Sequence, residues 1–351
     1  MANSTLPSGR YGSGRWRRAM LHDGGTIKGT HDAKILSIVI FQLLSIHYFH
    51  VMNPIIPPAL QPGDHIALIS PSRFGEPEHL ALARTWAESH GWHLVTAPNY
   101  GHRHHQMGGT VSERVEDFHW AVEDPNIKAI WSVRGGYGAV QIVDRIDWGG
   151  LLRNPKWLIG FSDSTVLLQH ALQLGIASAH AWMPIPSVNV SQDTKDSLAH
   201  VLSGNWKGLC APSHPFQKEG EAQGRLVGGN LSVLYSLLGS ESFPNLDGAI
   251  LVLEDLDEYL YHIDRMLMGL ARSGVLDNVA GVAVGGLSDM NDNVVPFGEK
   301  AEEIMHRMLP STIPVAFNMP IGHAFENQAF INGCDVAFRV DSEGASITPI
   351  L

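Results

Sequence analysis

The chain contains very few cysteines, because Cys210 and Cys334 are the only two among its 351 residues. Two cysteines provide no disulfide framework, and no CxxC pair is present to suggest structural zinc. Basic residues are also scarce, since 24 Lys and Arg stand against 35 Asp and Glu, for a net charge of −11. An acidic protein repels phosphate backbones, so we expect no nucleic acid among its partners.

The chain is rich in apolar residues, and no residue type or segment dominates its composition. The chain is 44% apolar with 36 Gly, and neither an internal repeat nor a low-complexity tract stands out. Such a composition is typical of a globular enzyme with a substantial core, and the length suits one large or two medium domains.

The N-terminal extension, residues 1–52, allows three interpretations. Residues 35–52 form a mostly apolar run near the lower limit for spanning a bilayer, weakened by one glutamine and two histidines. A membrane anchor would place the enzyme outside the cytoplasm. A removable signal peptide fits poorly because no A-x-A-type cleavage site follows. We favour the third interpretation, in which Met52 is the true initiator and residues 1–51 do not belong to the native protein.

Strands and helices alternate from Gly63 onward. The expected strands are 64–70, 92–97, 127–133 and 157–160, and the expected helices are 78–90, 110–123, 139–145 and the run after 165. This alternation predicts a doubly wound parallel sheet, whose ligands bind beyond the carboxyl ends of the strands. We assign residues 53–204 to this α/β domain.

The regular alternation of strands and helices ends after Gly204. Residues 205–224 are rich in Gly, Pro, Ser and Lys and are predicted to be a linker. Residues 225–351 are predicted to form a smaller, β-rich and partly barrel-like domain. Its expected elements are a helix after Asn230, strands at 249–254 and 279–284, and a helix at 263–273.

The most informative motif presents a serine at a strand-to-helix turn. The apolar run ending at Gly160 is followed by Phe161, Ser162 and Asp163, and then by helical apolar spacing. Such a turn can expose a nucleophilic Oγ beside free backbone N–H groups. Helix capping by Ser162 or Asp163 is the alternative explanation.

A nucleophilic serine needs a base and an acid that orients the base. The best base is His323, which follows a glycine in a loop after an apolar strand. The best acid is Glu254, which ends another apolar strand, where a buried charge requires a partner. His180 is interpreted either as a residue lining the cleft or as a core histidine with its hydrogen bonds satisfied. The loop histidines at 102, 104 and 105 lack metal-ligand spacing, so we expect no metal site.

Eight motifs together resemble the LD-carboxypeptidase family, which includes muropeptide tetrapeptidases and microcin C7 self-immunity hydrolases. They are LQPGDHIA at 60–67, SPS at 70–72, RGGYG at 134–138, GFSD at 160–163, GGNLS at 228–232, LED at 253–255, IDRML at 263–267 and GH at 322–323. The resemblance runs from about residue 57 to 351. It implies a flavodoxin-like N-terminal domain and a smaller β-rich domain, with the active site between them.

The resemblance also implies the roles of individual residues. It assigns a catalytic triad to Ser162, Glu254 and His323, and an oxyanion hole to the backbone N–H groups of Asp163 and Gly136. As substrate-binding residues we expect Arg134, Tyr137, Asn230 and His180.

The function implied is that of a serine carboxypeptidase of peptidoglycan recycling, which releases terminal D-alanine from a murein tetrapeptide without a metal or organic cofactor. A cytoplasmic homodimer is expected, with membrane contact only if residues 35–52 are an anchor. Three alternatives stay open: a microcin C7-type hydrolase of acyl nucleotides, an esterase resembling the α/β-hydrolases, and a non-catalytic binding protein. The esterase predicts GxSxG, whereas here Ser164 stands in the last position.

Overall fold

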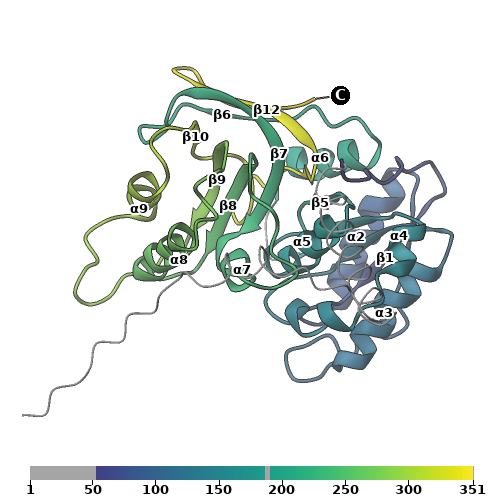
Figure 1. Cartoon of the computed structure of the whole chain (residues 1–351). Coiled ribbons are helices and arrows are strands. Elements are labelled where there is room, and N and C mark those ends of the chain that lie inside the picture. The colour runs from purple at the N-terminus through teal and green to yellow at the C-terminus, as the bar shows by residue number, and fades with distance from the viewer. Residues whose placement is uncertain (1–52, 186–189, 351) are drawn as a thin grey trace, which may run out of the picture. The chain divides into compact units, whose positions relative to one another are not determined.

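The computed structural model describes residues 53–185 and 190–350 (Figure 1). The proposed anchor at 35–52 and the proposed start at Met52 lie outside these residues. In the two described ranges, no helix is long and apolar enough to cross a membrane.

The first sheet is the doubly wound sheet that the sequence predicts. Its strands are β1 (His65–Ile69), β2 (His93–Thr96), β3 (Ile127–Ser132), β4 (Trp157–Gly160), β5 (Ser178–His180) and β11 (Phe330–Asn332). The order is β11-β5-β4-β3-β1-β2, and the first five strands in sequence are parallel. The order 2-1-3-4-5 is that of flavodoxin-like folds, with a switch point between β1 and β3. Strand β11, from the C-terminal half, adds antiparallel to β5.

Helices cover both faces of this sheet, because side chains along each strand alternate between two cores. Ile66 and Leu68 pack in the cluster that contains residues of α2 (Pro77–Ser89) and α6 (Gln192–Leu202). Ala67 and Ile69 pack in the cluster that contains α3 (Val111–Glu123), α4 (Gly149–Arg153) and α5 (Thr165–Gln173). The two sets of helices leave the strand ends accessible.

Residues 139–145 do not form the α-helix that we expected. They form two 3₁₀ helices, η1 (Ala139–Gln141) and η2 (Val143–Arg145). Bonds of the i to i−3 type join Ile142 N to Ala139 O at 3.1 Å and Arg145 N to Ile142 O at 2.9 Å. The preceding Gly138 has φ of +135°, outside the helical region, so the chain enters the segment from a turn.

The second sheet has the order β10-β9-β8-β7-β12-β13-β6. Its strands are β6 (Leu209–Pro212), β7 (Gly220–Asn230), β8 (Ile250–Leu256), β9 (Gly281–Ser288), β10 (Val315–Ala316), β12 (Asp335–Asp341) and β13 (Gly344–Pro349). The pairings from β7 to β10 are parallel, and those among β7, β12, β13 and β6 are antiparallel. An isolated bridge joins Lys218 to Val315 of the edge strand β10. The mixed α/β, two-sheet architecture predicted from the sequence is therefore confirmed.

Strand β8 lies between two cores. Leu251 and Leu253 pack with α7 (Leu231–Ser236), α8 (Leu260–Arg272) and α9 (Ala301–Met308). Ile250 and Val252 belong to the large cluster that also contains residues of the first sheet. The two sheets therefore share a core, and β7 lies beside α5 (Figure 1).

The segment 205–224, predicted to be a linker, contains β6 and the first five residues of β7. Strand β6 pairs with β13, and the start of β7 pairs with β12. Both stretches are exposed at every second residue, because only one face of each is buried. Local composition therefore resembled that of a linker.

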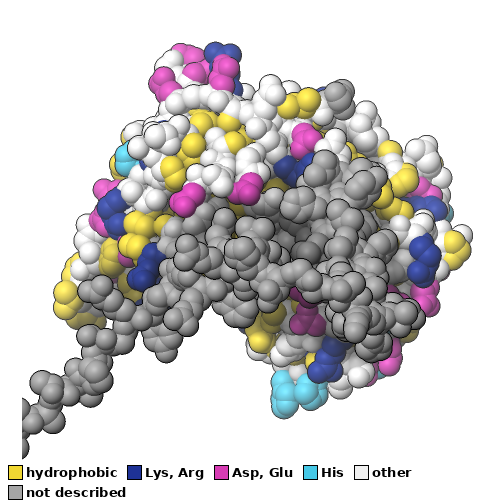
Figure 2. All heavy atoms as spheres, in the orientation of Figure 1, with side chains coloured by type: hydrophobic (Ala, Val, Ile, Leu, Met, Phe, Trp, Pro, Cys, Tyr) yellow, Lys and Arg dark blue, Asp and Glu magenta, His cyan; other side chains and the backbone are white. Residues whose placement is uncertain are grey.

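Charges are mixed on the visible surface. On the coloured part of the face in Figure 2, acidic and basic side chains are interspersed, and we see no continuous basic patch among the described residues there.

Candidate active site

Ser162 follows the carboxyl end of β4 with a backbone conformation unusual for a serine. Its φ is +58°, and it begins the 3₁₀ turn η3 (Ser162–Ser164), which continues into α5. A non-glycine residue in this region is held there by its surroundings at a cost of about 1–3 kcal/mol. Gly160 permits the turn, because a Cβ at that position would lie 2.7 Å from Ser164 Oγ. The geometry is that of a sharp strand-to-helix elbow that exposes a side chain.

Glu254 and His323, separated by 69 positions in the chain, form a buried pair. Glu254 lies within β8 and is 0% exposed, whereas the side chain of His323 retains 17% exposure. Glu254 Oε2 lies 2.7 Å from His323 Nδ1 and also accepts the His323 backbone N–H at 3.2 Å. The carboxylate thus fixes the ring orientation through Nδ1 and leaves Nε2 free for a second partner.

The two groups of this pair shift each other's pKa in opposite directions. Burial alone would lower the pKa of His323, but the charge of Glu254 and the hydrogen bond to it raise that pKa above 6.5. Burial alone would raise the pKa of Glu254, but the His323 charge and hydrogen bonds lower it. Glu254 is therefore ionised at neutral pH, and His323 is a stronger base than a free imidazole.

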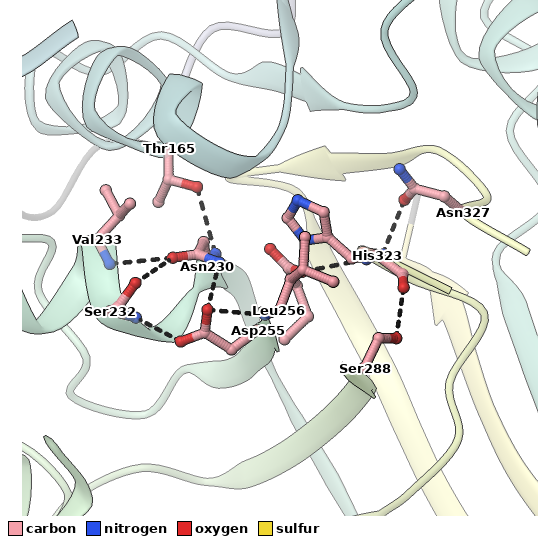
Figure 3. Close-up of polar contacts among 11 residues, drawn as sticks. Thr165, Asn230, Ser232, Val233, Asp255, Leu256, Ser288, His323 and Asn327 are labelled. Carbon is pink, nitrogen blue, oxygen red and sulfur yellow. Dashed lines mark hydrogen bonds and ion pairs between the residues drawn. The ribbon is translucent and has the colours of Figure 1, made fainter. Parts of the chain in front are cut away.

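Two polar contacts hold the loop that carries His323 in place (Figure 3). Gly322 has φ of +87°, and its N–H donates to Asn327 Oδ1 at 2.8 Å. Ser288 Oγ donates to the carbonyl oxygen of His323. A Cβ on Gly322 would collide with Glu254, so this position requires glycine.

A glycine turn after β3 lies against Ser162. A Cβ built on Gly135 would be 3.1 Å from Ser162 Oγ and 3.3 Å from the backbone N of Asp163. The buried Asp163 carboxylate joins this turn to the β1 loop, because Oδ2 accepts from Ser72 Oγ at 2.5 Å and from Ala139 N at 2.9 Å. Asp163 therefore contributes its side chain as well as its backbone to the elbow.

A cavity of about 550 Å³ brings several of these residues together. Ser162, His323, Arg134 and Gly136 all line it, with Trp182 among its apolar walls. Phe161 contributes another wall and lies with its ring 4.7 Å from the His323 ring. Among the described residues, no direct hydrogen bond joins Ser162 to His323.

Two of the expected substrate-binding residues have other surroundings. Asn230 is buried and caps α7: its Oδ1 accepts Val233 N at 3.1 Å, and its Nδ2 donates to Asp255 Oδ1 at 2.9 Å (Figure 3). Burial and the neighbouring Glu254 raise the pKa of Asp255 to about 7. Tyr137 is 47% exposed at the tip of the glycine turn. Neither side chain is among those that line the 550 Å³ cavity.

His180 lies beneath the site and is 0% exposed. Its ring stacks on Phe330 at 4.6 Å, and neither ring nitrogen has a hydrogen-bond partner. Burial lowers its pKa to about 4, so the ring is neutral. Glu254 Oε1 is likewise buried without a partner, and its charge acts on His180. Of the two interpretations from sequence, the core position is found, but the ring is not satisfied by hydrogen bonds.

Sequence reasoning missed Ser72 and Arg73, and it gave the side chain of Asp163 no role other than helix capping, for which η3 and α5 show no side-chain hydrogen bond. The available signal was that residues 70–73 follow β1, beside the switch point of the sheet, where doubly wound folds place their ligands. In the ranges 53–185 and 190–350, no group of three His, Cys, Asp or Glu side chains could hold a metal ion.

A strained serine elbow that shares a cavity with a buried carboxylate–imidazole pair is typical of hydrolases with a serine nucleophile. Sequence comparison gives the family. The models of the LD-carboxypeptidase N-terminal and C-terminal domains match residues 66–181 and 223–338. The chain belongs to the LD-carboxypeptidase family and is a peptide hydrolase of that class.

Named relatives match about four fifths of this chain. A murein tetrapeptide carboxypeptidase of Pseudomonas aeruginosa is 31% identical over 78% of this chain and 92% of its own length. The microcin C7 self-immunity protein of Escherichia coli is 24% identical over 84% and 96%. Among solved structures, the muramoyltetrapeptide carboxypeptidase of Oxalobacter formigenes matches with a TM-score of 0.74 at 23% identity, covering 81% of this chain and 97% of its own. This last likeness establishes the fold.

Proposed function

We propose that the protein is a serine carboxypeptidase that releases terminal D-alanine from a murein tetrapeptide in peptidoglycan recycling. The observation that carries the proposal is the buried Glu254–His323 pair, which shares one cavity with Ser162 on its strained turn. The relatives from Pseudomonas aeruginosa and, at 30% identity over 83% of this chain, Bacillus subtilis are named for action on murein peptides. Their names supply the substrate class.

The proposed mechanism assigns each group one step. His323, oriented and made more basic by Glu254, takes the proton from Ser162 Oγ as the oxygen attacks the scissile carbonyl. The backbone N–H groups of Gly136 and Asp163 stabilise the tetrahedral oxyanion. His323 then protonates the amine of the leaving D-alanine, and water releases the acyl group from Ser162 by the same steps in reverse.

A hydrolase of the microcin C7 type is the second candidate, because that self-immunity protein matches most of this chain. The same triad would serve it, with an acyl nucleotide as substrate. An esterase is less well supported, since the elbow lacks the final glycine of GxSxG. A binding protein without catalysis gives no reason for a buried carboxylate to orient an imidazole toward a cavity.

The test is hydrolysis of three purified compounds. We expect release of D-alanine from L-Ala-D-Glu-diaminopimelate-D-Ala and none from the diastereomer that ends in L-alanine. The third compound is an acyl-adenylate analogue such as aspartyl sulfamoyl adenosine, for which we expect slow or no hydrolysis. Hydrolysis of the analogue alone would move the assignment to the second candidate, and hydrolysis of none by folded protein would refute the peptidase.

We further propose a cytoplasmic homodimer that needs no metal or organic cofactor. The family resemblance supports the dimer, and the unpaired thiols of Cys210 and Cys334 are compatible with a reducing compartment. Light scattering tests the dimer, and activity after exhaustive chelation tests independence from metals. Membrane contact is expected only if residues 35–52 form an anchor, which fractionation of the native host would detect.

A further inference from the structure

Two guanidinium groups beside the glycine turn lack an anionic partner. Arg134 begins this turn and lines the 550 Å³ cavity together with Ser162. Arg73 comes from the loop after β1 and covers Gly136, where an added Cβ would lie 2.6 Å from Arg73 Nε. Arg73 Nε is buried and has no hydrogen-bond partner. In the described part of the chain, neither arginine makes a hydrogen bond or an ion pair.

Two other arginines of the chain have partners for their guanidinium groups. Arg114 donates to two backbone carbonyls, of Pro71 and Gly138, at 2.8 and 2.9 Å. Arg307 contacts two carboxylates, of Glu299 and Asp264, both at 2.7 Å. A buried donor without an acceptor is costly, so an arginine pair left without partners calls for an external acceptor.

The charge around Arg134 points to an anion. Burial and the neighbouring charge of Arg73 both lower the pKa of Arg134, as expected for two like charges close together. Glu76 is the one acid that acts on Arg134, but it already pairs with Arg103 at 3.4 Å. Among the described residues, no ion pair neutralises the positive charge at this edge of the cavity.

We infer that Arg134, assisted by Arg73, binds the C-terminal carboxylate of the peptide substrate. The inference rests on the proposed function and names its specificity residues. In a peptide whose scissile carbonyl lies at Ser162, the terminal carboxylate carbon is three bonds farther, about 4 Å away. Only Gly135 separates Arg134 from Gly136, whose N–H belongs to the proposed oxyanion hole, so the guanidinium starts within reach of that carboxylate.

The chemistry of the pair matches this ligand. A guanidinium presents two parallel N–H donors to a carboxylate, and such charge-assisted bonds are stronger than neutral ones. A peptide that continues past the terminal residue would bring a neutral amide to this place and leave the two charges unpaired. The site would thus restrict the enzyme to removing one C-terminal residue.

The experiment compares a tetrapeptide that ends in a free D-alanine carboxylate with the same peptide ending in D-alaninamide. Turnover is measured for the wild type, Arg134→Gln, Arg134→Lys and Arg73→Gln. Arg84→Gln is the matched control, because Arg84 is an exposed arginine of α2 that does not line the cavity. Circular dichroism and thermal unfolding establish that each variant is folded.

We expect the wild type to prefer the free acid. Arg134→Gln should raise KM for the acid about 10- to 100-fold, the value of a lost hydrogen bond to a charged group, with little change for the amide. Arg134→Lys should restore part of the affinity, and Arg73→Gln should have a smaller effect in the same direction. Equal losses on the acid and the amide, or no discrimination by the wild type, would overturn the inference.

Calorimetry separates this inference from the proposed function. Binding of the acid and the amide is measured in the Ser162→Ala variant, with and without Arg134→Gln, so that turnover plays no part. A preference for the acid that is lost with Arg134 supports the carboxylate site even if the tetrapeptide is not hydrolysed. If instead AMP binds and requires Arg134 while the two peptides bind equally, the site recognises a phosphate and the inference is wrong.

Discussion

Replacing Glu254 with glutamine tests whether this carboxylate sets the basicity of His323. Glutamine has nearly the same shape, and its amide oxygen can accept the two hydrogen bonds that Glu254 Oε2 accepts from His323 at 2.7 and 3.2 Å. The amide nitrogen would then occupy the place of Oε1, which has no partner. The substitution therefore removes the charge while the geometry can be kept.

The expected loss of activity follows from the contact between Glu254 and His323. An opposite charge within about 4–6 Å shifts a pKa by about 1–3 units. Without Glu254, the burial that lowers the pKa of His323 is no longer opposed, so this pKa should fall below 6.5. The weaker and less well oriented base should reduce kcat/KM by about 10²–10⁴ at neutral pH.

The assay is D-alanine release between pH 5 and 9. A base must be neutral to act, so the acidic limb of kcat/KM for the wild type should lie above pH 6.5. The limb of Glu254→Gln should lie at lower pH, below 6.5. Glu258→Gln is the matched control, since Glu258 pairs with His262 at 2.9 Å on the partly exposed start of α8. An unmoved limb in Glu254→Gln, or an equal movement in Glu258→Gln, would refute the reasoning.

Three further variants test other parts of the structure. Gly136→Ala, at φ +103°, should lower kcat about 10²-fold or more. The control Gly175→Ala, at φ +80° with open space around it, should leave kcat unchanged. Equal effects of the two variants would show that the glycine turn has no role in catalysis. His180→Phe keeps a buried ring but removes the ring nitrogens near Glu254, so kcat should fall about tenfold at constant KM. A raised KM instead would indicate that His180 contacts the substrate. Lys156 is 0% exposed, and burial lowers its pKa to about 8 in the folded state. Between this pH and the ordinary lysine pKa of 10.5, the unfolded state binds more protons than the folded state. The free energy of unfolding should therefore rise from pH 8 to 10.5. Lys156→Met should lack this rise in denaturant unfolding, and identical pH curves would contradict the burial of a charge.

The apolar pattern of the sequence predicted most strands and helices of the first sheet. The strands of the first sheet carry continuous apolar runs because both their faces are buried, and the helices between them have clear apolar periodicity. Pairings between distant segments were not predictable in this way. Strand β11 joins the first sheet although it lies about 150 residues after β5 in the chain, and β6 lies in a segment that reads as a linker.

In the candidate site, too, some features could be predicted from the sequence and others could not. The positions of Ser162 and His323 after strands were visible in sequence. Glu254 was expected at a strand end but lies within β8, which continues to Leu256, and its contact with His323 agrees with the expected pairing. The conformation of Ser162, with φ of +58°, was not visible, because serine has no intrinsic preference for it. Arg73 was missed because its importance arises only when the β1 loop folds over Gly136.

The central claim is that Ser162 is the nucleophile of a carboxypeptidase. The most direct test is the rate of D-alanine release from the murein tetrapeptide by Ser162→Ala, compared with Ser164→Ala two positions later in the same turn. We predict that Ser162→Ala lowers kcat/KM at least about 10³-fold, while Ser164→Ala stays within about tenfold of the wild type. Release by folded Ser162→Ala at a rate near that of the wild type would contradict the claim.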